Sequence, residues 1–307
     1  MTYDLGVSSQ SRLKSELSVS GGHINSHDVW MFSSHLHTWL RVASLRKGRW
    51  RHEMAALQGQ LFAVGSFHGL QHLHSVERDD PFSHIWAAAA PLPEAVSSEA
   101  AAALRDRGWW AGWPQTRWVG AGTGGLPWVG VQCFDPQEDH WSLRSPMPLS
   151  QQCLEAVSLE DTIYMVGGLM GTVFTYSPGT DVLGEAAVLP SPVLPGAEDC
   201  GVTVCDGKIH ILGGQDGRGE STNRLFTFDP SSGQVEAQPS LLCRTSSHSC
   251  ITIVQSLAGD SDSDRLSREQ REEDELSLSA LLFSPHGTSV WMAPYLVAPF
   301  LVEIKPH

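Results

Sequence analysis

The chain of 307 residues carries 34 acidic and 20 basic side chains, which give a formal net charge of −14 and a sequence pI of about 5.4. This balance argues against a nucleic-acid binder, because attraction to phosphate needs a basic face. The 29 glycines, 18 prolines and 11 tryptophans favour many short strands joined by frequent turns, so we expect an all-β protein.

Residues 1–16 show no basic stretch followed by an apolar run, so we predict an N-terminal extension without a secretory signal. No window reaches the roughly 18 uninterrupted apolar residues of a membrane helix, since Pro294 and Pro299 break the best candidate. We therefore expect a soluble, cytoplasmic chain that does not enter a membrane. In that compartment its six cysteines are predicted to be free thiols.

An apolar, β-prone run that ends in glycine recurs along residues 17–257. Glycine at the end of a strand permits a bend and close backbone approach. The glycines of the successive copies are Gly21 and Gly22, then Gly65, then Gly167 and Gly168, then Gly213 and Gly214.

A second recurring piece is a strand that runs into a turn, usually Asp-Pro, with a large apolar residue five positions after the proline. Asp accepts hydrogen bonds from the turn backbone and Pro presets φ, so each copy predicts a hairpin. The bulky residue is expected to fill the gap between neighbouring sheets. The copies are Asp80–Pro81 with Trp86, Asp135–Pro136 with Trp141, Ser177–Pro178 with Leu183, and Asp229–Pro230 with Val235, and Trp39 keeps the spacing in the first unit.

These pieces recur about every 45 residues and supply about four short strands per unit, which is typical of the blades of a β-propeller. Five repeat intervals lie between Gly21 and a terminal strand at Ser249–Val254, so we expect five to six four-stranded blades. The third unit is irregular. Five tryptophans stand between Leu104 and Gly130 in place of the expected strand and glycine pair, as in an altered exon, a gene-modelling error or an exposed loop.

The combination of glycine pair, Asp-Pro turn, tryptophan and proline-containing loop resembles the kelch repeat, and residues 17–257 resemble the propeller of the kelch-like family. In that family BTB and BACK domains precede six kelch blades. The resemblance implies a propeller that binds a protein substrate for a cullin-3 ubiquitin ligase. This chain shows no BTB or BACK segment, so cullin-3 is an expected partner only if another isoform or chain supplies the BTB domain.

Two other functions stay open at this stage: a cytoskeletal or scaffold kelch protein, and, less favoured, a metal-dependent propeller enzyme. An incomplete ring would also expose blade edges that promote aggregation. By the resemblance, partner contacts fall directly after the glycine pair and in the loop about 15 residues earlier. The predicted rim residues are His23, Phe67, Leu169 and Gln215 in the first position, Trp50, Gln152, Glu198 and His248 in the second, and Arg51 and Arg218 nearby.

We predict no catalytic residues, metal or cofactor. A glycine-rich stretch at Gly120–Gly125 has the dinucleotide spacing, but no apolar strand precedes it and Pro127 stands where a helix should begin. His68, His72, His74 and His84 are read as hairpin side chains because their spacing does not force them to converge. Residues 258–307 form a predicted tail, acidic and then apolar and poorly ordered, with a net charge of −5 between Asp260 and Glu275.

Overall fold

The computed structural model describes most of the repeat region of the chain and two short segments beyond it. Statements about structure refer to these residues alone. They are residues 16–20, 26–33, 38–50, 52–80, 83, 85–114, 130–144, 154–168, 170–190, 196–246, 250, 253–254 and 302–303.

The described residues include five antiparallel sheets of three or four strands, which we call sheets 1 to 5 in chain order. Sheet 1 has three strands: β1 (Glu16–Ser20), β2 (Val29–Ser33) and β3 (Thr38–Arg41). Sheet 2 contains β4 (Glu53–Leu57), β5 (Gln60–Val64), β8 (Val76–Asp80) and β9 (Ile85–Ala89). Sheet 3 contains β10 (Val96–Leu104), β11 (Arg107–Pro114), β12 (Gly130–Asp135) and β13 (His140–Leu143). Sheet 4 contains β14 (Leu154–Leu159), β15 (Thr162–Gly167), β16 (Thr172–Ser177) and β17 (Val182–Val188). Sheet 5 contains β18 (Gly201–Cys205), β19 (Lys208–Leu212), β20 (Leu225–Asp229) and β21 (Gln234–Gln238).

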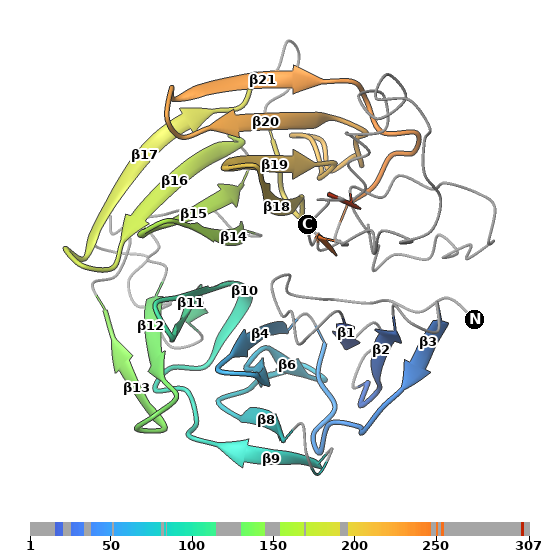
Figure 1. The fold of residues 1–307 in the computed structure, drawn as a ribbon, viewed down its shortest axis with the longest axis vertical. Coiled ribbons are helices and arrows are strands. Elements are labelled where there is room, and N and C mark those ends of the chain that lie inside the picture. The colour runs from blue at the N-terminus through green and yellow to red at the C-terminus, as the bar shows by residue number, and fades with distance from the viewer. Residues whose placement is uncertain are drawn as a thin grey trace, which may run out of the picture.

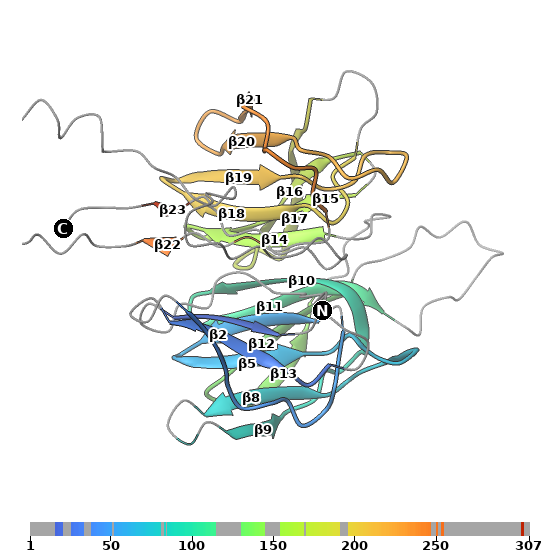
Figure 2. The same ribbon diagram turned by 90° about the vertical axis from the view of Figure 1, so that its right-hand side faces the viewer.

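The sheets are arranged around a common centre as the blades of a propeller (Figure 1; Figure 2 gives the view from the side). The first strands of sheets 2 to 5 lie innermost, and β10 contacts both β4 and β14, which in turn contacts β18. Strands β9, β13, β17 and β21 lie on the outside (Figure 1). Within each of these five sheets, the strands lie side by side in the order of the sequence.

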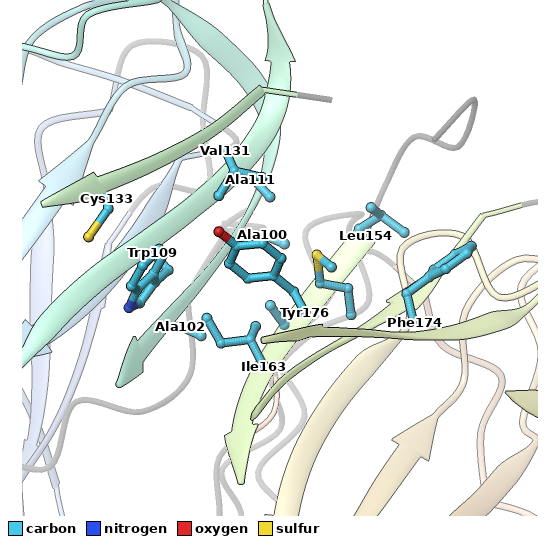
Figure 3. Packing of buried hydrophobic residues seen from close by; sticks show 12 residues of the cluster. Ala100, Ala102, Trp109, Ala111, Val131, Cys133, Leu154, Ile163, Phe174 and Tyr176 are labelled. Carbon is cyan, nitrogen blue, oxygen red and sulfur yellow. The ribbon is translucent and has the colours of Figure 1, made fainter. Parts of the chain in front are cut away.

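Apolar side chains fill the spaces between successive sheets and make one core per interface. Sheets 3 and 4 pack through Trp109, Ile163 and Tyr176 among others (Figure 3). Equivalent clusters join sheet 1 to sheet 2, sheet 2 to sheet 3 and sheet 4 to sheet 5. Because each blade buries its faces against its neighbours, the fold depends on the stacking of blades rather than on any single sheet.

The turns confirm the chemistry expected of the Asp-Pro positions. Asp135 ends β12 and its Oδ1 accepts the amide of Gln137 at 3.0 Å, and Asp229 ends β20 and accepts the amide of Ser231 at 2.9 Å. Asp80 ends β8 and accepts the hydroxyl of Ser83. Pro136 and Pro230 occupy the turns that follow, whereas Pro81 lies outside the described residues.

A tryptophan ties sheet 2 to sheet 1, and another ties sheet 3 to sheet 2. Trp86 and Trp141 are both buried. The indole Nε1 of Trp86 donates to the carbonyl of Ala43 at 2.9 Å, and that of Trp141 donates to the carbonyl of Ala90 at 2.8 Å. Trp39 lies in β3 opposite Phe32 in the strand register. Trp86 and Trp141 therefore fill their interfaces, and each bonds to the segment that leaves the preceding sheet.

The expectation that the third unit lacks a strand is wrong. Strand β11 pairs with both β10 and β12, and sheet 3 has four strands. Trp109 and Trp110 are neighbours in a strand, so they point to opposite faces, where Trp109 joins the core with sheet 4 and Trp110 joins the core with sheet 2. Trp118, Trp128 and the glycine-rich stretch at 120–125 lie outside the described residues.

The glycine pair of sheet 5 allows a test of whether glycine is required after the second strand of a sheet. Gly213 and Gly214 follow β19, and Gly214 has a φ of 84°. A Cβ at this position would stand 2.9 Å from the Cβ of Cys200 and 3.1 Å from the carbonyl oxygen of Glu198. We expect Gly214→Ala to lower the free energy of unfolding by about 2–4 kcal/mol, because left-handed strain adds to overpacking. Urea denaturation measures this loss.

Gly207 provides the matched control. It lies in the turn between β18 and β19 with a φ of 70°, but a Cβ there meets no atom within 4 Å. Gly207→Ala should therefore cost only the backbone strain, about 1 kcal/mol. Equal losses for the two variants would show that the close approach to Cys200 contributes nothing.

The two ends of the described chain form sheets with fewer strands than sheets 2 to 5. Sheet 1 has three described strands, and β22 (Ile253–Val254) pairs in parallel with β23 (Val302–Glu303). Gly21 and Gly22 lie outside the described residues, as does most of the predicted tail at 258–307. Within the described part, no helix has the length and apolar character needed to cross a membrane. Cys133, Cys200, Cys205, Cys243 and Cys250 are free thiols.

Candidate protein-binding face

Two kinds of connection between strands lie on one face of the propeller. Tight turns such as Gln58–Gly59 join the first and second strands of a sheet at one end. Because adjacent strands are antiparallel, the connection from the second to the third strand lies at the opposite end, together with the segment that enters the next sheet. Isolated bridges join the two kinds of connection in sheet 2, at Trp50 and Phe67, and in sheet 5, at Glu198 and Gln215. We call this end the connection face.

An aromatic group stands on the connection face of sheet 2. Trp50 precedes β4, and Phe67 begins the hairpin formed by β6 (Phe67–His68) and β7 (Gln71–His72). Their rings stack with centroids 5.0 Å apart and planes at 27°, and the ring of Phe67 lies 4.5 Å from that of His72. The indole Nε1 of Trp50 donates to the carbonyl of Gly69 at 3.0 Å. Stacking and hydrogen bonding thus fix the hairpin against the loop before β4.

A buried ion pair supports this group from the interior. Arg49 is fully buried, and its guanidinium donates to the carboxylate of Glu77 at 2.8 Å. It also donates to the carbonyls of Gly65 and Ser75, which flank the hairpin, at 3.1 and 2.9 Å. Glu77 accepts the backbone amides of Arg46 and Lys47. The pair therefore holds both ends of the hairpin and the loop that carries Trp50.

The connection face of sheet 5 is polar. The amide of Gln215 donates to the carbonyl of Glu198 at 2.7 Å. Asp216 accepts the amides of Arg218 and Glu220 at 2.9 and 3.1 Å, and these bonds hold the pKa of Asp216 below its usual value. Burial, with the neighbouring charge of Asp199, raises the pKa of Glu198. Arg218 is exposed on the turn that Asp216 organises.

The structure therefore brings together the predicted rim residues Trp50 and Phe67, and separately Glu198, Gln215 and Arg218. That they contact a partner remains a prediction. The other rim predictions lie outside the described residues: His23, Arg51, Gln152, Leu169 and His248.

Sequence reasoning missed the exposed apolar side chains of this face. Leu70 at the tip of the β6–β7 hairpin is 94% exposed, and Met170 and Leu242 on other connections are 52% and 78% exposed. The glycine in His68-Gly69-Leu70 was the available signal for a hairpin turn, since Gly69 has a φ of 62°.

The histidines of sheet 2 are engaged in local contacts. His68 Nδ1 lies 2.7 Å from the carbonyl of Gly48, and His74 Nδ1 lies 2.9 Å from that of Leu92. The ring of His72 lies against that of Phe67 in a tilted arrangement, and partial burial lowers the pKa of His72. Over the described residues, no three His, Cys, Asp or Glu side chains converge on a point suited to a metal ion. His84 lies outside the described residues.

A buried histidine next to the rim predicts a pH dependence of stability. His52 Nε2 lies 2.6 Å from the hydroxyl of Ser20 in sheet 1, and burial, with the charge of Arg49 second, lowers the pKa of His52 well below its usual value. The unfolded chain takes up this proton near pH 6.5, but the folded chain does not. The free energy of unfolding should therefore be highest above about pH 6.5 and fall as the pH drops toward about 5.

Urea denaturation between about pH 8 and 5 measures this dependence. The variant His52→Gln supplies the comparison, because it removes the titrating group while His210, whose pKa burial also lowers, remains. We expect a shallower decline for the variant than for the original chain. Parallel curves would show that His52 does not set the pH dependence.

Comparisons with known proteins agree with this architecture. The kelch motif model matches residues 198–242, which span the entry to sheet 5 and all four of its strands. Kelch-like protein 35 from Mus musculus is 67% identical over 246 residues, and that from Homo sapiens is 70% identical over 245 residues. The described chain is a kelch-repeat propeller.

The kelch-like relatives are longer than this chain. The matches cover 80% of the chain but only 41% of the mouse protein and 40% of the human protein. Kelch-like protein 24 from Rattus norvegicus is 39% identical over 242 residues, which cover 78% of this chain and 38% of that protein. The chain therefore matches about two fifths of each relative, and the activity of a whole kelch-like protein is a proposal here.

A solved structure of YjhT shares the fold. The two structures align with a TM-score of 0.67 over 82% of this chain and 88% of YjhT, at 13% sequence identity. At that identity the match concerns the architecture alone.

Proposed function

We propose that the kelch propeller of this chain binds a partner protein through its connection face. The observation that carries the proposal is the Trp50–Phe67 stack, held by its own hydrogen bonds and by the buried Arg49–Glu77 pair. Loops on a rigid scaffold are the usual place for recognition, and aromatic side chains supply large contact areas at low entropic cost. Similarity to kelch-like proteins supports the same role.

The finer proposal is that the bound partner is a substrate of a cullin-3 ubiquitin ligase in the cytoplasm. This step follows from the resemblance to the kelch-like family. In this proposal, cullin-3 is a partner only when a BTB domain is supplied together with the propeller. The chain would then act as a non-catalytic recognition module.

Affinity capture from cells tests the proposal with three forms of the chain: the original, Trp50→Ala with Glu198→Arg, and Ile85→Asp. Ile85 is 61% exposed on the outer strand β9 and serves as the control. We expect a protein that is enriched with the original and the control but lost with the double variant. Capture that is unchanged by the double variant would refute binding at this face.

Co-expression of a BTB-containing kelch-like chain tests the ligase role. Recovery of cullin-3 together with the captured partner, only when that chain is present, would support substrate recognition. Enrichment of actin or its binding proteins without cullin-3 would instead select the scaffold function.

A further inference from the structure

Two exposed cations stand beside the aromatic stack of the connection face. Arg46 and Lys47 form a bend in the loop that leads from β3 to β4, and both are exposed. Neither forms an ion pair with another described residue, whereas the exposed side chains of Arg41 and Arg105 each pair with an aspartate. In a chain with a net charge of −14, these two adjacent cations keep their charge available to a ligand.

Hydrogen bonds hold the backbone of this loop in place. The buried carboxylate of Glu77 accepts the amides of Arg46 and Lys47 at 2.6 and 3.1 Å, while the two side chains remain exposed. The amide of Leu45 donates to the carbonyl of His27 at 2.9 Å, which ties the loop to the segment before β2. Because the backbone is already fixed, binding of a ligand would order only the two side chains.

The cations and the β6–β7 hairpin belong to one surface. Gly48 follows Lys47, and its carbonyl lies 2.7 Å from Nδ1 of His68 in the hairpin. Two residues further along the loop, the ring of Trp50 stacks on that of Phe67. The hairpin at residues 67–72 contains no carboxylate. We call this surface the cation–aromatic patch and define it by Arg46, Lys47, Trp50, Phe67 and the exposed Leu70.

The charge of the propeller is negative in two other regions. On the sheet 5 part of the connection face, residues 196–200 and 213–220 carry four carboxylates and one cation. At the opposite end of the propeller, the turns between the first and second strands carry Asp106, Glu160, Asp161 and Asp206, and Arg105 there pairs with Asp161. These two regions repel an acidic ligand, whereas the cation–aromatic patch attracts it.

We propose that the cation–aromatic patch binds an acidic segment of the partner protein, with an aromatic or aliphatic side chain of that segment against Trp50, Phe67 and Leu70. The inference rests on the proposed function, because it names the chemistry of the partner at the connection face. Carboxylates suit the patch because the Arg46 guanidinium can bind one through two parallel hydrogen bonds. A nucleic acid suits it less, because the net charge of −14 opposes a phosphate chain that extends beyond two cations.

Selection from a random library of short peptides displayed on phage tests this chemistry. The full chain is compared with Arg46→Glu plus Lys47→Glu, and with a control that reverses two charges at the opposite end, Arg105→Glu plus Lys208→Glu. We expect the original chain and the control to retain peptides enriched in Asp and Glu that also carry an aromatic or aliphatic residue. The Arg46 and Lys47 variant should lose this enrichment. A selection without acidic enrichment, or with equal enrichment on all three chains, would overturn the inference.

The affinity for the partner captured by the original chain gives a second measurement. Arg46→Glu with Lys47→Glu should weaken binding about 10-fold, and Arg46→Gln with Lys47→Gln about 3-fold, because each exposed charge pair contributes modestly. Added salt should weaken binding to the original chain more than to the glutamine variant. Thermal unfolding of the glutamine variant should match that of the original chain, because the bonds to Glu77 come from the backbone.

The two proposals fail in different ways. If Trp50→Ala with Glu198→Arg abolishes capture while both Arg46 and Lys47 variants keep the original affinity, the connection face binds a partner but not through an acidic segment. Displacement of the selected acidic peptides by a single-stranded RNA oligonucleotide at lower concentration would assign the patch to nucleic acid and also overturn the inference. If none of these variants changes capture, the proposed function itself is wrong.

Discussion

Replacement of Arg49 by alanine is expected to lower the free energy of unfolding by about 3–5 kcal/mol, a large part of the stability of a typical domain. The guanidinium of Arg49 is fully buried and pairs with the buried carboxylate of Glu77 at 2.8 Å. Removal of one partner leaves an uncompensated charge in the interior and frees the carbonyls of Gly65 and Ser75 from their donor. Urea denaturation followed by circular dichroism measures the change.

Arg105 provides the contrast for this measurement. It also forms an ion pair, with Asp161 in the next sheet, but the two side chains are 66% and 70% exposed. Exposed ion pairs contribute little to folding stability, so Arg105→Ala should leave the unfolding midpoint nearly unchanged. A small loss for Arg49→Ala, similar to that of Arg105→Ala, would contradict the supporting role that we assign to the buried pair.

Replacement of Trp110 by alanine is the second large effect, with an expected loss of about 3–5 kcal/mol in the free energy of unfolding. Trp110 is fully buried between sheets 2 and 3, where its ring meets that of Trp141 edge-on with centroids 5.0 Å apart. The backbone of Gly108 lies so close to the Trp110 ring that any Cβ there would overlap it. The space between sheets 2 and 3 therefore fits this indole closely, and alanine at position 110 would leave a cavity.

Trp110→Phe is the matched control. It keeps an aromatic ring in the interface and removes an indole N–H that is buried without a hydrogen-bond partner among the described residues. We expect it to lose less than half as much stability as the alanine variant. An unfolding curve for Trp110→Ala that matches that of the original chain would show that β11 is not part of the core.

The same tryptophans show where sequence reasoning failed. The window from Leu104 to Gly130 lacks the usual apolar run, so an interrupted unit was expected, yet β11 forms and carries two consecutive tryptophans. Their side chains point to opposite faces, and each face of a blade is an interface with a neighbour. A blade strand that is buried on both faces can therefore carry two adjacent bulky residues. The alternation of apolar and polar residues in a strand with one exposed face would not predict this pair.

Other elements followed from local chemistry alone. The turns at Asp135–Pro136 and Asp229–Pro230 could be predicted because Asp bonds to amides within its own turn. The buried positions of Trp86 and Trp141 followed from their constant offset after those turns. The pairing of Trp50 with Phe67 matched the spacing of the predicted rim, but the hairpin at residues 67–72 and the exposure of Leu70 did not follow from the repeat pattern.

The class of fold, the four-stranded repeat and the positions of the turns could be predicted from sequence, because those features depend on residues close together in the chain. Contacts between side chains 20 or more residues apart could be seen only in the folded chain. Arg49 with Glu77 and Trp110 with Trp141 are examples, since each pair joins segments whose distance is set by the register of the sheets and the stacking of blades. The exposure of Leu70 is a further case, because it depends on how the hairpin is anchored above the buried ion pair.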